Sequence, residues 1–203
     1  MRPRDIDRFF ALLGKRVESP VQIILTGGGA AILEGVSRAT RDLDFQIVLR
    51  TRSAARRQAL QEAILRVERE TGIAAQYDAA IETWSSISWP ARRPKSASYK
   101  MFGCIEVRIL DPLWWSVGKL TRYLSYDISD VVTVFKTTRI SPDRAARAWG
   151  KALGRSPLSN AQPIFRRQVL DFFASHGRRL WGSSFDSNTA VRLFLQSARR
   201  KRT

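Results

Sequence analysis

The sequence is poor in the residues that build disulfide, zinc and histidine-based catalytic sites. Of its 203 residues, one is cysteine, Cys104, and one is histidine, His176. A single cysteine excludes a disulfide framework within the chain, and the lack of a Cys-x-x-Cys pair or a Cys/His cluster argues against structural zinc. His176 precedes Gly177 near an expected helix end, and no motif supports Ser–His or Cys–His catalysis. Any catalytic chemistry therefore has to use other groups.

Long apolar segments are also lacking. No apolar run approaches the ~20 residues that a membrane-spanning helix needs, and the first residues do not follow the pattern of a signal peptide. These absences predict a cytoplasmic protein without a membrane partner.

Acidic residues are scarce and unevenly distributed. The chain has 35 Lys+Arg against 18 Asp+Glu, a formal charge of +17, and residues 138–203 hold 14 of the cations and only 3 of the acids. Such a field attracts polyanions, and contacts with phosphates weaken as salt rises. Four arginines in this region flank apolar residues, as on the polar face of a packed helix. The predicted nucleic-acid contacts are Arg166, Arg167, Arg178 and Arg179.

A glycine-rich turn follows the first apolar segment. The run 21–25 predicts a buried strand that stops at Thr26-Gly27-Gly28-Gly29, and residues 30–34 have the composition of a short helix. Without Cβ atoms, such a turn lets backbone N–H groups approach an anion, and the helix start adds unpaired donors. The pattern favours a phosphate site, with a plain strand-to-helix turn as the alternative.

Two carboxylates follow on the next expected strand, residues 42–49. Asp42 and Asp44 alternate with apolar residues, so both side chains point to one face. They repel each other, and because only Arg41 stands nearby in sequence, the pair needs a cation. Mg²⁺, or Mn²⁺ in its place, takes oxygen ligands from carboxylates, water and phosphates. Phosphate turn and metal pair together imply nucleoside triphosphate chemistry, but a P-loop would need Gly-Lys-Ser/Thr where this chain has Gly29-Ala30-Ala31.

Two motifs carry a family resemblance. The first is Gly27-Gly28-x-Ala30-x-x-Leu33-x-Gly35 followed by Arg38-x-Thr40-x-Asp42-Leu43-Asp44. The second is Leu110-Asp111-Pro112-Leu113, then Lys119-Leu120-x-Arg122, then Asp127-x-x-Asp130-Val131. Together they resemble the nucleotidyltransferases of the DNA polymerase β type, and more narrowly the AbiEii-like and related bacterial nucleotidyltransferases of toxin–antitoxin systems. The resemblance covers roughly residues 21–134, and the first motif is the more specific.

The resemblance implies roles for named residues. Asp42 and Asp44 would be catalytic metal ligands. The nucleotide-binding residues would be Thr26, Gly27, Gly28, Arg38, Thr40 and Lys119, with Arg122 nearby. An exposed helix residue is the alternative for Lys119. Asp127 suits the N-cap of the helix that follows it, and Asp130 is assigned to the fold.

Polymerase-type sites use a third carboxylate to hold a second metal or to deprotonate the acceptor hydroxyl. Glu106 is the predicted residue, because it lies on the polar side of the alternating segment 104–110 and matches the family's third acidic position. The equally weighted alternative is a surface glutamate paired with an arginine across strands. Asp78 and Glu82 are weaker rivals.

The expected architecture is α+β, with a nucleotidyltransferase-type mixed sheet flanked by helices in residues 1–137 and a basic all-helical region in residues 138–203. The expected helices are 6–16, 29–36 and 53–71, the expected strands 21–26, 42–49, 73–77, 82–88 and 99–110, and the expected loop 90–95. From Pro112 onward the pattern is helical, with breaks near 141–142, 156–157 and 182–184.

These observations predict an Mg²⁺-dependent enzyme that transfers a nucleoside monophosphate from an NTP to an acceptor hydroxyl. The family implies two acceptor types, RNA such as transfer RNA, or a protein that is adenylylated, and the basic region favours RNA. An antitoxin protein is an expected partner. The competing hypothesis is a catalytically idle fold of this type that binds nucleic acid, which a missing third carboxylate would favour.

Overall fold

The computed structural model describes residues 1–49, 53–87 and 95–199, and of residues 82 and 83 it describes the backbone alone. The chain divides into two compact units, Met1–Ile81 with Ser96–Leu110, and Glu82–Lys95 with Asp111–Thr203. The predicted boundary at residue 137 falls inside the second unit, and the assignment of functional domains stays a prediction.

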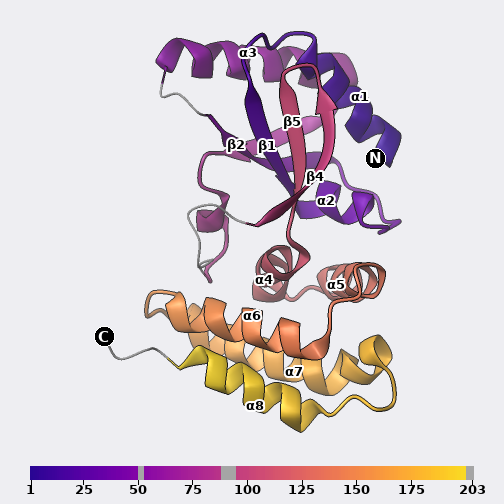
Figure 1. Cartoon of the computed structure of the whole chain (residues 1–203), viewed down its shortest axis with the longest axis vertical. Helices are drawn as coiled ribbons and strands as arrows, with labels where there is room; N and C mark the ends of the chain where they lie inside the picture. Colours follow the sequence, from indigo (N-terminus) through magenta and orange to yellow (C-terminus); the bar gives the residue numbers. More distant parts are fainter. Residues whose placement is uncertain (50–52, 88–94, 200–203) are drawn as a thin grey trace. The chain divides into compact units, whose positions relative to one another are not determined.

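The first unit is a five-stranded sheet with helices (Figure 1). Its elements are α1 (Pro3–Gly14), β1 (Val21–Thr26), α2 (Gly27–Leu33), β2 (Asp42–Val48), α3 (Ala54–Thr71), β3 (Ala74–Asp78), β4 (Ser96–Phe102) and β5 (Ile105–Leu110). The strand order is β3-β2-β1-β5-β4, with β1–β5 and β2–β3 parallel and β1–β2 and β4–β5 antiparallel. The predicted α+β class with a mixed sheet is confirmed; its nucleotidyltransferase type stays a proposal.

One face of this sheet is apolar and the other polar. The apolar face carries Ile23, Leu25, Leu43, Phe45 and Val107, all buried. Helix α1 packs there because its apolar residues recur at helical spacing: Phe10 lies 5.8 Å, ring to ring, from Phe45. By the strand registers, the opposite face carries the polar residues Gln22, Thr26, Asp42, Asp44, Gln46, Gln76, Asp78, Glu106 and Arg108.

Three local predictions for residues 27–110 need correction. The predicted strand 99–110 is two antiparallel strands, β4 and β5, because Gly103 turns the chain with a φ of 57° that favours glycine. The predicted strand 82–88 is wrong, since a short 3₁₀ helix, η1 (Ile81–Trp84), is followed by bends up to residue 87. Residues 88 and 90–94 of the predicted strand and loop lie outside the described residues. The predicted helix 29–36 begins earlier, so the three glycines form the first turn of α2.

The second unit is helical, as predicted. Its helices are α4 (Pro112–Arg122), α5 (Ser125–Thr137), α6 (Pro142–Arg155), α7 (Ala161–Trp181) and α8 (Ser187–Ala198). The three predicted breaks fall between helices, and a further break follows α4, where Tyr123 has a φ of 56°. No helix in the described ranges is long and apolar enough to cross a membrane.

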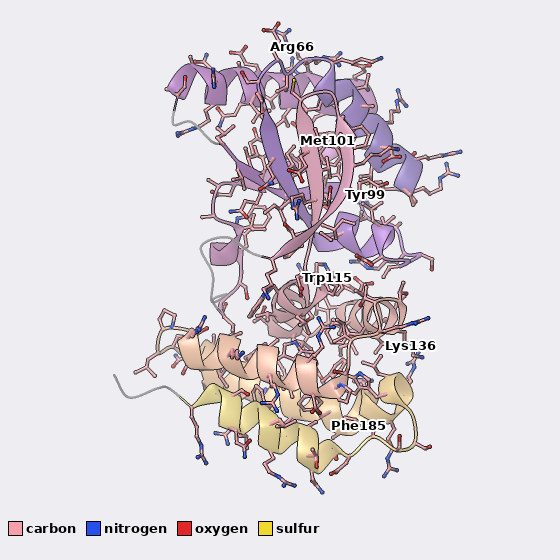
Figure 2. All side chains as sticks on the ribbon, viewed as in Figure 1. Arg66, Tyr99, Met101, Trp115, Lys136 and Phe185 are labelled. Atoms are coloured by element: carbon pink, nitrogen blue, oxygen red, sulfur yellow. The ribbon has the colours of Figure 1, made fainter. Side chains whose placement is uncertain are left out.

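Trp149 of α6 is the centre of the second unit's core. Its fully buried indole lies 5.8 Å from the Phe135 ring, 5.4 Å from Phe172 and 5.3 Å from Phe173, centroid to centroid. Its Nε1 donates a 2.9 Å hydrogen bond to the buried Ser116 Oγ, so the polar end of the ring is satisfied. The aromatic cluster extends to Phe185, labelled in Figure 2, whose ring lies 4.9 Å from that of Trp181.

Helices α6 and α8 touch at glycines. A Cβ on Gly150 would collide with the Phe194 carbonyl oxygen, and one on Gly154 would lie 2.6 Å from the Ala198 carbonyl oxygen. Because successive contacts advance along both chains together, α6 and α8 run in the same direction and end side by side (Figure 1).

Because of the glycine contact between α6 and α8, we expect a glycine-to-alanine substitution to destabilise the protein at Gly150 and to stabilise it at Gly118. Gly150→Ala should lower the free energy of unfolding by ~1–3 kcal/mol, because the backbone of α8 cannot move aside cheaply. Gly118→Ala, where a Cβ would meet nothing within 4 Å, should raise it by ~0.4–1 kcal/mol. Urea unfolding of both variants measures the difference, and equal stabilisation would contradict the close helix contact.

Candidate functional site

The glycine turn is built around two side chains from the β2 region. Gly27 has a φ of 57°, and a Cβ there would collide with the Asp44 carboxylate. A Cβ on Gly28 would lie 2.6 Å from the Thr40 hydroxyl oxygen. The two glycines are therefore required by the close approach of Asp44 and Thr40 to the backbone, independently of any bound anion.

Asp42 and Asp44 lie on the polar face of the sheet at the end of β1. Asp44 pairs with Thr26 across the antiparallel strands. The Asp42 carboxylate accepts a 3.1 Å hydrogen bond from Thr40 Oγ1 and another of 3.1 Å from Gln76 Nε2. Among the described residues Asp42 forms no salt bridge, so neutral donors orient its charge without compensating it. The two aspartates can offer oxygen ligands to a divalent cation, which would relieve their mutual repulsion.

Gln46 lies on the same polar face of the sheet, and the sequence analysis did not predict it as a site residue. It lies two residues beyond Asp44, is 4 % exposed, and donates a 2.6 Å hydrogen bond from Nε2 to the Ala79 carbonyl oxygen. In the described part of the chain, its buried Oε1 has no hydrogen-bond partner. Buried acceptors are normally satisfied, so this amide oxygen is positioned for a donor from water or a ligand. The alternation along β2 was the signal that placed it beside Asp44.

The structure does not bring Glu106 to the two aspartates. Glu106 pairs with Gln22, four residues along β1 from Thr26, the partner of Asp44. This offset is roughly 13 Å along the strand direction. The Glu106 carboxylate instead accepts from Arg108 Nη1 at 2.6 Å and from Gln22 Nε2 at 2.9 Å. The alternation of apolar and polar residues predicted correctly which face of the sheet carries Glu106. Its position along that face depends on the register between β1 and β5.

Asp78 and Glu82 are the other candidates for the third carboxylate. Asp78 lies on the strand next to β2, two positions beyond Gln76, the partner of Asp44. This diagonal is roughly 8 Å, shorter than the separation from Glu106. The Asp78 carboxylate accepts hydrogen bonds from the backbone N–H groups of the next two residues, Ala79 and Ala80. The side chain of Glu82 lies outside what is described. No group of three or more His, Cys, Asp or Glu residues suited to a metal occurs among the described residues.

Two other predicted nucleotide contacts lie near α2. Arg38 donates a 3.3 Å hydrogen bond from Nη1 to the Ala39 carbonyl oxygen, and Thr40 is held against Gly28 and Asp42 as described above. At the end of α2, burial raises the pKa of the Glu34 carboxyl.

Lys119 lies in the second unit, in a buried ion-pair cluster with α5. It is 3 % exposed, and its ammonium donates to Asp127 at 2.9 Å and to Asp130 at 2.8 Å. Arg122 also donates to Asp127, at 2.8 Å. Two of the three ammonium hydrogens are thereby used. The predicted N-cap role of Asp127 is wrong, because Leu124 is the N-cap of α5 and Asp127 is inside its first turn, buried by its ion pairs.

The four predicted nucleic-acid contacts are all exposed on α7, but they do not form one cluster. Arg167 and Arg178 are close to three turns apart and project together, away from the buried face, separated by roughly 16 Å. Arg166 and Arg179 turn to opposite flanks of the helix. Exposure follows from the polar pattern, whereas the direction of each side chain depends on the helical angle.

Comparison with protein-family models, with curated proteins and with solved structures finds no match for this chain.

The contact of Asp44 with Gly27 predicts unequal costs at two left-handed glycines. Gly72 also has a positive φ, 70°, but a Cβ there would meet nothing within 4 Å. Gly72→Ala should therefore cost only the strain of the left-handed conformation, ~1–2 kcal/mol. Gly27→Ala should cost a further ~1–3 kcal/mol, because Asp44 has to move. Denaturant unfolding compares the two, and equal losses would show that Asp44 relocates freely.

Proposed function

We propose that this protein is an Mg²⁺-dependent nucleotidyltransferase that moves a nucleoside monophosphate from an NTP to an acceptor hydroxyl and releases pyrophosphate. The observation that carries the proposal is the pair Asp42 and Asp44, on one sheet face beside the glycine turn. The motif resemblance over residues 21–134 supports it. The cytoplasm is the proposed location.

The residues around the aspartates fit a divalent cation. Thr40 and Gln76 orient the Asp42 carboxylate, and Gly27 leaves room for that of Asp44. When bound there, Mg²⁺ would neutralise triphosphate oxygens and polarise the reacting phosphoryl group. The backbone of Thr26, Gly27 and Gly28 would contact the phosphates.

The cationic contacts of the triphosphate are proposed from the resemblance. They are Arg38 and Lys119, with Arg122 nearby. Glu106 is left out of the metal set because of its register, and Asp78 becomes the next candidate for a third carboxylate.

RNA is the proposed acceptor. The exposed Arg167 and Arg178 on the outward side of α7 support it, because cations aligned along a helix can follow a phosphate backbone. Adenylylation of a partner protein remains the alternative acceptor, and an antitoxin stays an expected partner.

One observation favours a second function. Only two carboxylates gather at the glycine turn among the described residues, whereas the full polymerase-type set has three. A catalytically idle module of the same fold that binds nucleic acid would keep the basic helices without needing the third.

Metal-dependent nucleotide binding tests the aspartate pair. A mixture of ATP, GTP, CTP and UTP should raise the melting temperature by several degrees in Mg²⁺ and little in EDTA, because a ligand bound only by the native state stabilises it by mass action. Asp42→Asn should abolish this difference. Glu106→Gln is the matched control, a carboxylate on the same face away from the pair, and should retain it. Equal stabilisation by NTP with and without metal would contradict the proposed metal site.

Turnover tests the third carboxylate. Glu106→Gln should leave nucleotidyl transfer nearly unchanged, since Glu106 is bound by Arg108 and Gln22. Asp78→Asn should lower turnover by ~10²-fold if that carboxylate assists the chemical step. A loss of this size in Glu106→Gln alone would restore Glu106 as the third ligand.

The acceptor is identified by transfer of label from NTP to total RNA or to total cell protein. Label in RNA supports the first proposal, and label in protein supports adenylylation. RNA binding should weaken with a log–log salt slope of about −0.7 per neutralised phosphate of a single strand. Salt-sensitive RNA binding without any label transferred, in Mg²⁺ or Mn²⁺, would leave the idle module.

A further inference from the structure

The ends of α6 and α8 and the start of α7 enclose a groove in the second unit. Its volume is about 580 Å³, within the usual size of ligand pockets. Its lining is mainly aliphatic, with Leu153 from α6, Pro163 from α7 and Leu195 from α8. The exposed Arg166 and Arg199 also line it. An apolar floor with cationic edges is the result.

A second groove, of about 850 Å³, adjoins the first at the end of α8. The two share Gly154 and Arg199, and the second adds the exposed cations Lys151 and Arg155. Among the described residues, none that lines either groove is acidic. Four cations from three helices therefore gather at one end of the unit.

The acids of the last three helices lie away from Lys151, Arg166 and Arg199. In residues 138–199 the acids are Asp143, Asp171 and Asp186. Asp143 lies in the first turn of α6, Asp171 accepts from the Tyr123 hydroxyl at 2.6 Å, and Asp186 caps α8. The described residues include no salt bridge to Lys151, Arg166 or Arg199. The field at the grooves consequently favours an anionic partner.

Helix dipoles explain part of this arrangement but not all of it. Arg155 and Arg199 lie where α6 and α8 end, and cations there offset the partial negative charge. Arg166 lies near the start of α7, the positive end of that helix, so this explanation does not apply to it. The start of α7 also has no acid in its first turn and no side-chain cap. The Gln162 N–H donates to the Ser159 carbonyl oxygen at 3.2 Å and Pro163 has no N–H, so the attraction of the groove for a carboxylate comes from its arginines.

The apolar character of the groove distinguishes a protein partner from RNA. Single-stranded nucleic acids stack their bases on aromatic side chains, and no aromatic residue in the described part of the chain lines either groove. Leu158 and Ile164, in and after the α6–α7 turn, are 80 % and 46 % exposed. Such aliphatic surface is suited to the apolar side chains of a peptide. The chain's own residues 200–202 are Arg, Lys and Arg, so their charge is the wrong sign.

We propose that this groove binds an acidic amphipathic segment of a partner protein. Two or three apolar side chains spaced as on one helix face enter the groove between Leu153, Pro163 and Leu195. Flanking carboxylates pair with Arg166 and Arg199. Arg167 and Arg178, on the outward side of α7, take no part in this contact.

The test uses a fluorescent peptide of about fifteen residues, made of Leu, Glu and Ala with leucines on one helical face. Fluorescence anisotropy should show saturable binding to the full chain. Arg166→Glu should weaken it roughly tenfold, because the attraction becomes a repulsion. Arg167→Glu is the matched control, with the same charge change on the neighbouring residue of the same helix, and should change the affinity less than about twofold. Arg199→Glu gives a second variant outside α7, should Arg166→Glu unfold.

Three results would overturn the proposal. One is equal binding of a peptide of the same composition with scrambled leucines, which would mean attraction by charge alone. Another is equal loss in the Arg166→Glu and Arg167→Glu variants. The third is tighter binding of a single-stranded RNA of equal net charge that Arg166→Glu abolishes, which would assign the groove to nucleic acid. The NTP response in Mg²⁺ should persist in both variants, so this test does not depend on the aspartate site.

Discussion

The close approach of the Asp44 carboxylate to the α-carbon of Gly27 is the constraint on which the candidate site depends. It fixes the residue type at position 27, because any Cβ there would collide with the carboxylate. The pairing of Asp44 with Thr26 then places Asp42 beyond the end of β1, where Thr40 and Gln76 hold it. A carboxylate this close to the turn repels a bare phosphate, so the turn suits an NTP only when a cation lies between them.

In the second unit, too, glycine permits a close contact, here between two helices. Gly150 and Gly154 let α6 lie directly against the backbone of α8. Because the contacts advance from Gly150 and Phe194 to Gly154 and Ala198, the two helices run in parallel and end together, where α7 begins. Three helix ends bring Lys151, Arg155, Arg166 and Arg199 to one place, although Arg199 is far from the other three in sequence. The groove is thus a consequence of the helix contact, and no local sequence motif predicts it.

The sequence predicts elements better than it predicts distances between them. The apolar run predicted β1, and hydrophobic alternation predicted β2, nearly to the residue, and Pro112, Ser141 and Gly182 marked helix boundaries correctly. The hairpin at Gly103 was missed because the apolar run continues on both sides of the glycine. Glu106 was placed on the right face but at the wrong distance, since register between β1 and β5 depends on residues far away in the chain. The buried Gln46 oxygen, which has no hydrogen-bond partner in the described part of the chain, likewise depends on packing that periodicity does not encode. The divergence of Arg166 from Arg167, by contrast, follows from the roughly 100° between successive helix residues.

The two kinds of positive charge in the second unit have different physical roles. Lys119 is buried and compensated by Asp127 and Asp130, and removing one member of such a cluster costs ~3–5 kcal/mol because a buried charge is left unpaired. A triphosphate that reached Lys119 would have to compete with two carboxylates already at hydrogen-bond distance. The cluster therefore joins α4 to α5 whether or not a nucleotide binds. Lys151, Arg166 and Arg199 are exposed at the grooves and form no salt bridge among the described residues, so their charge is available to other molecules.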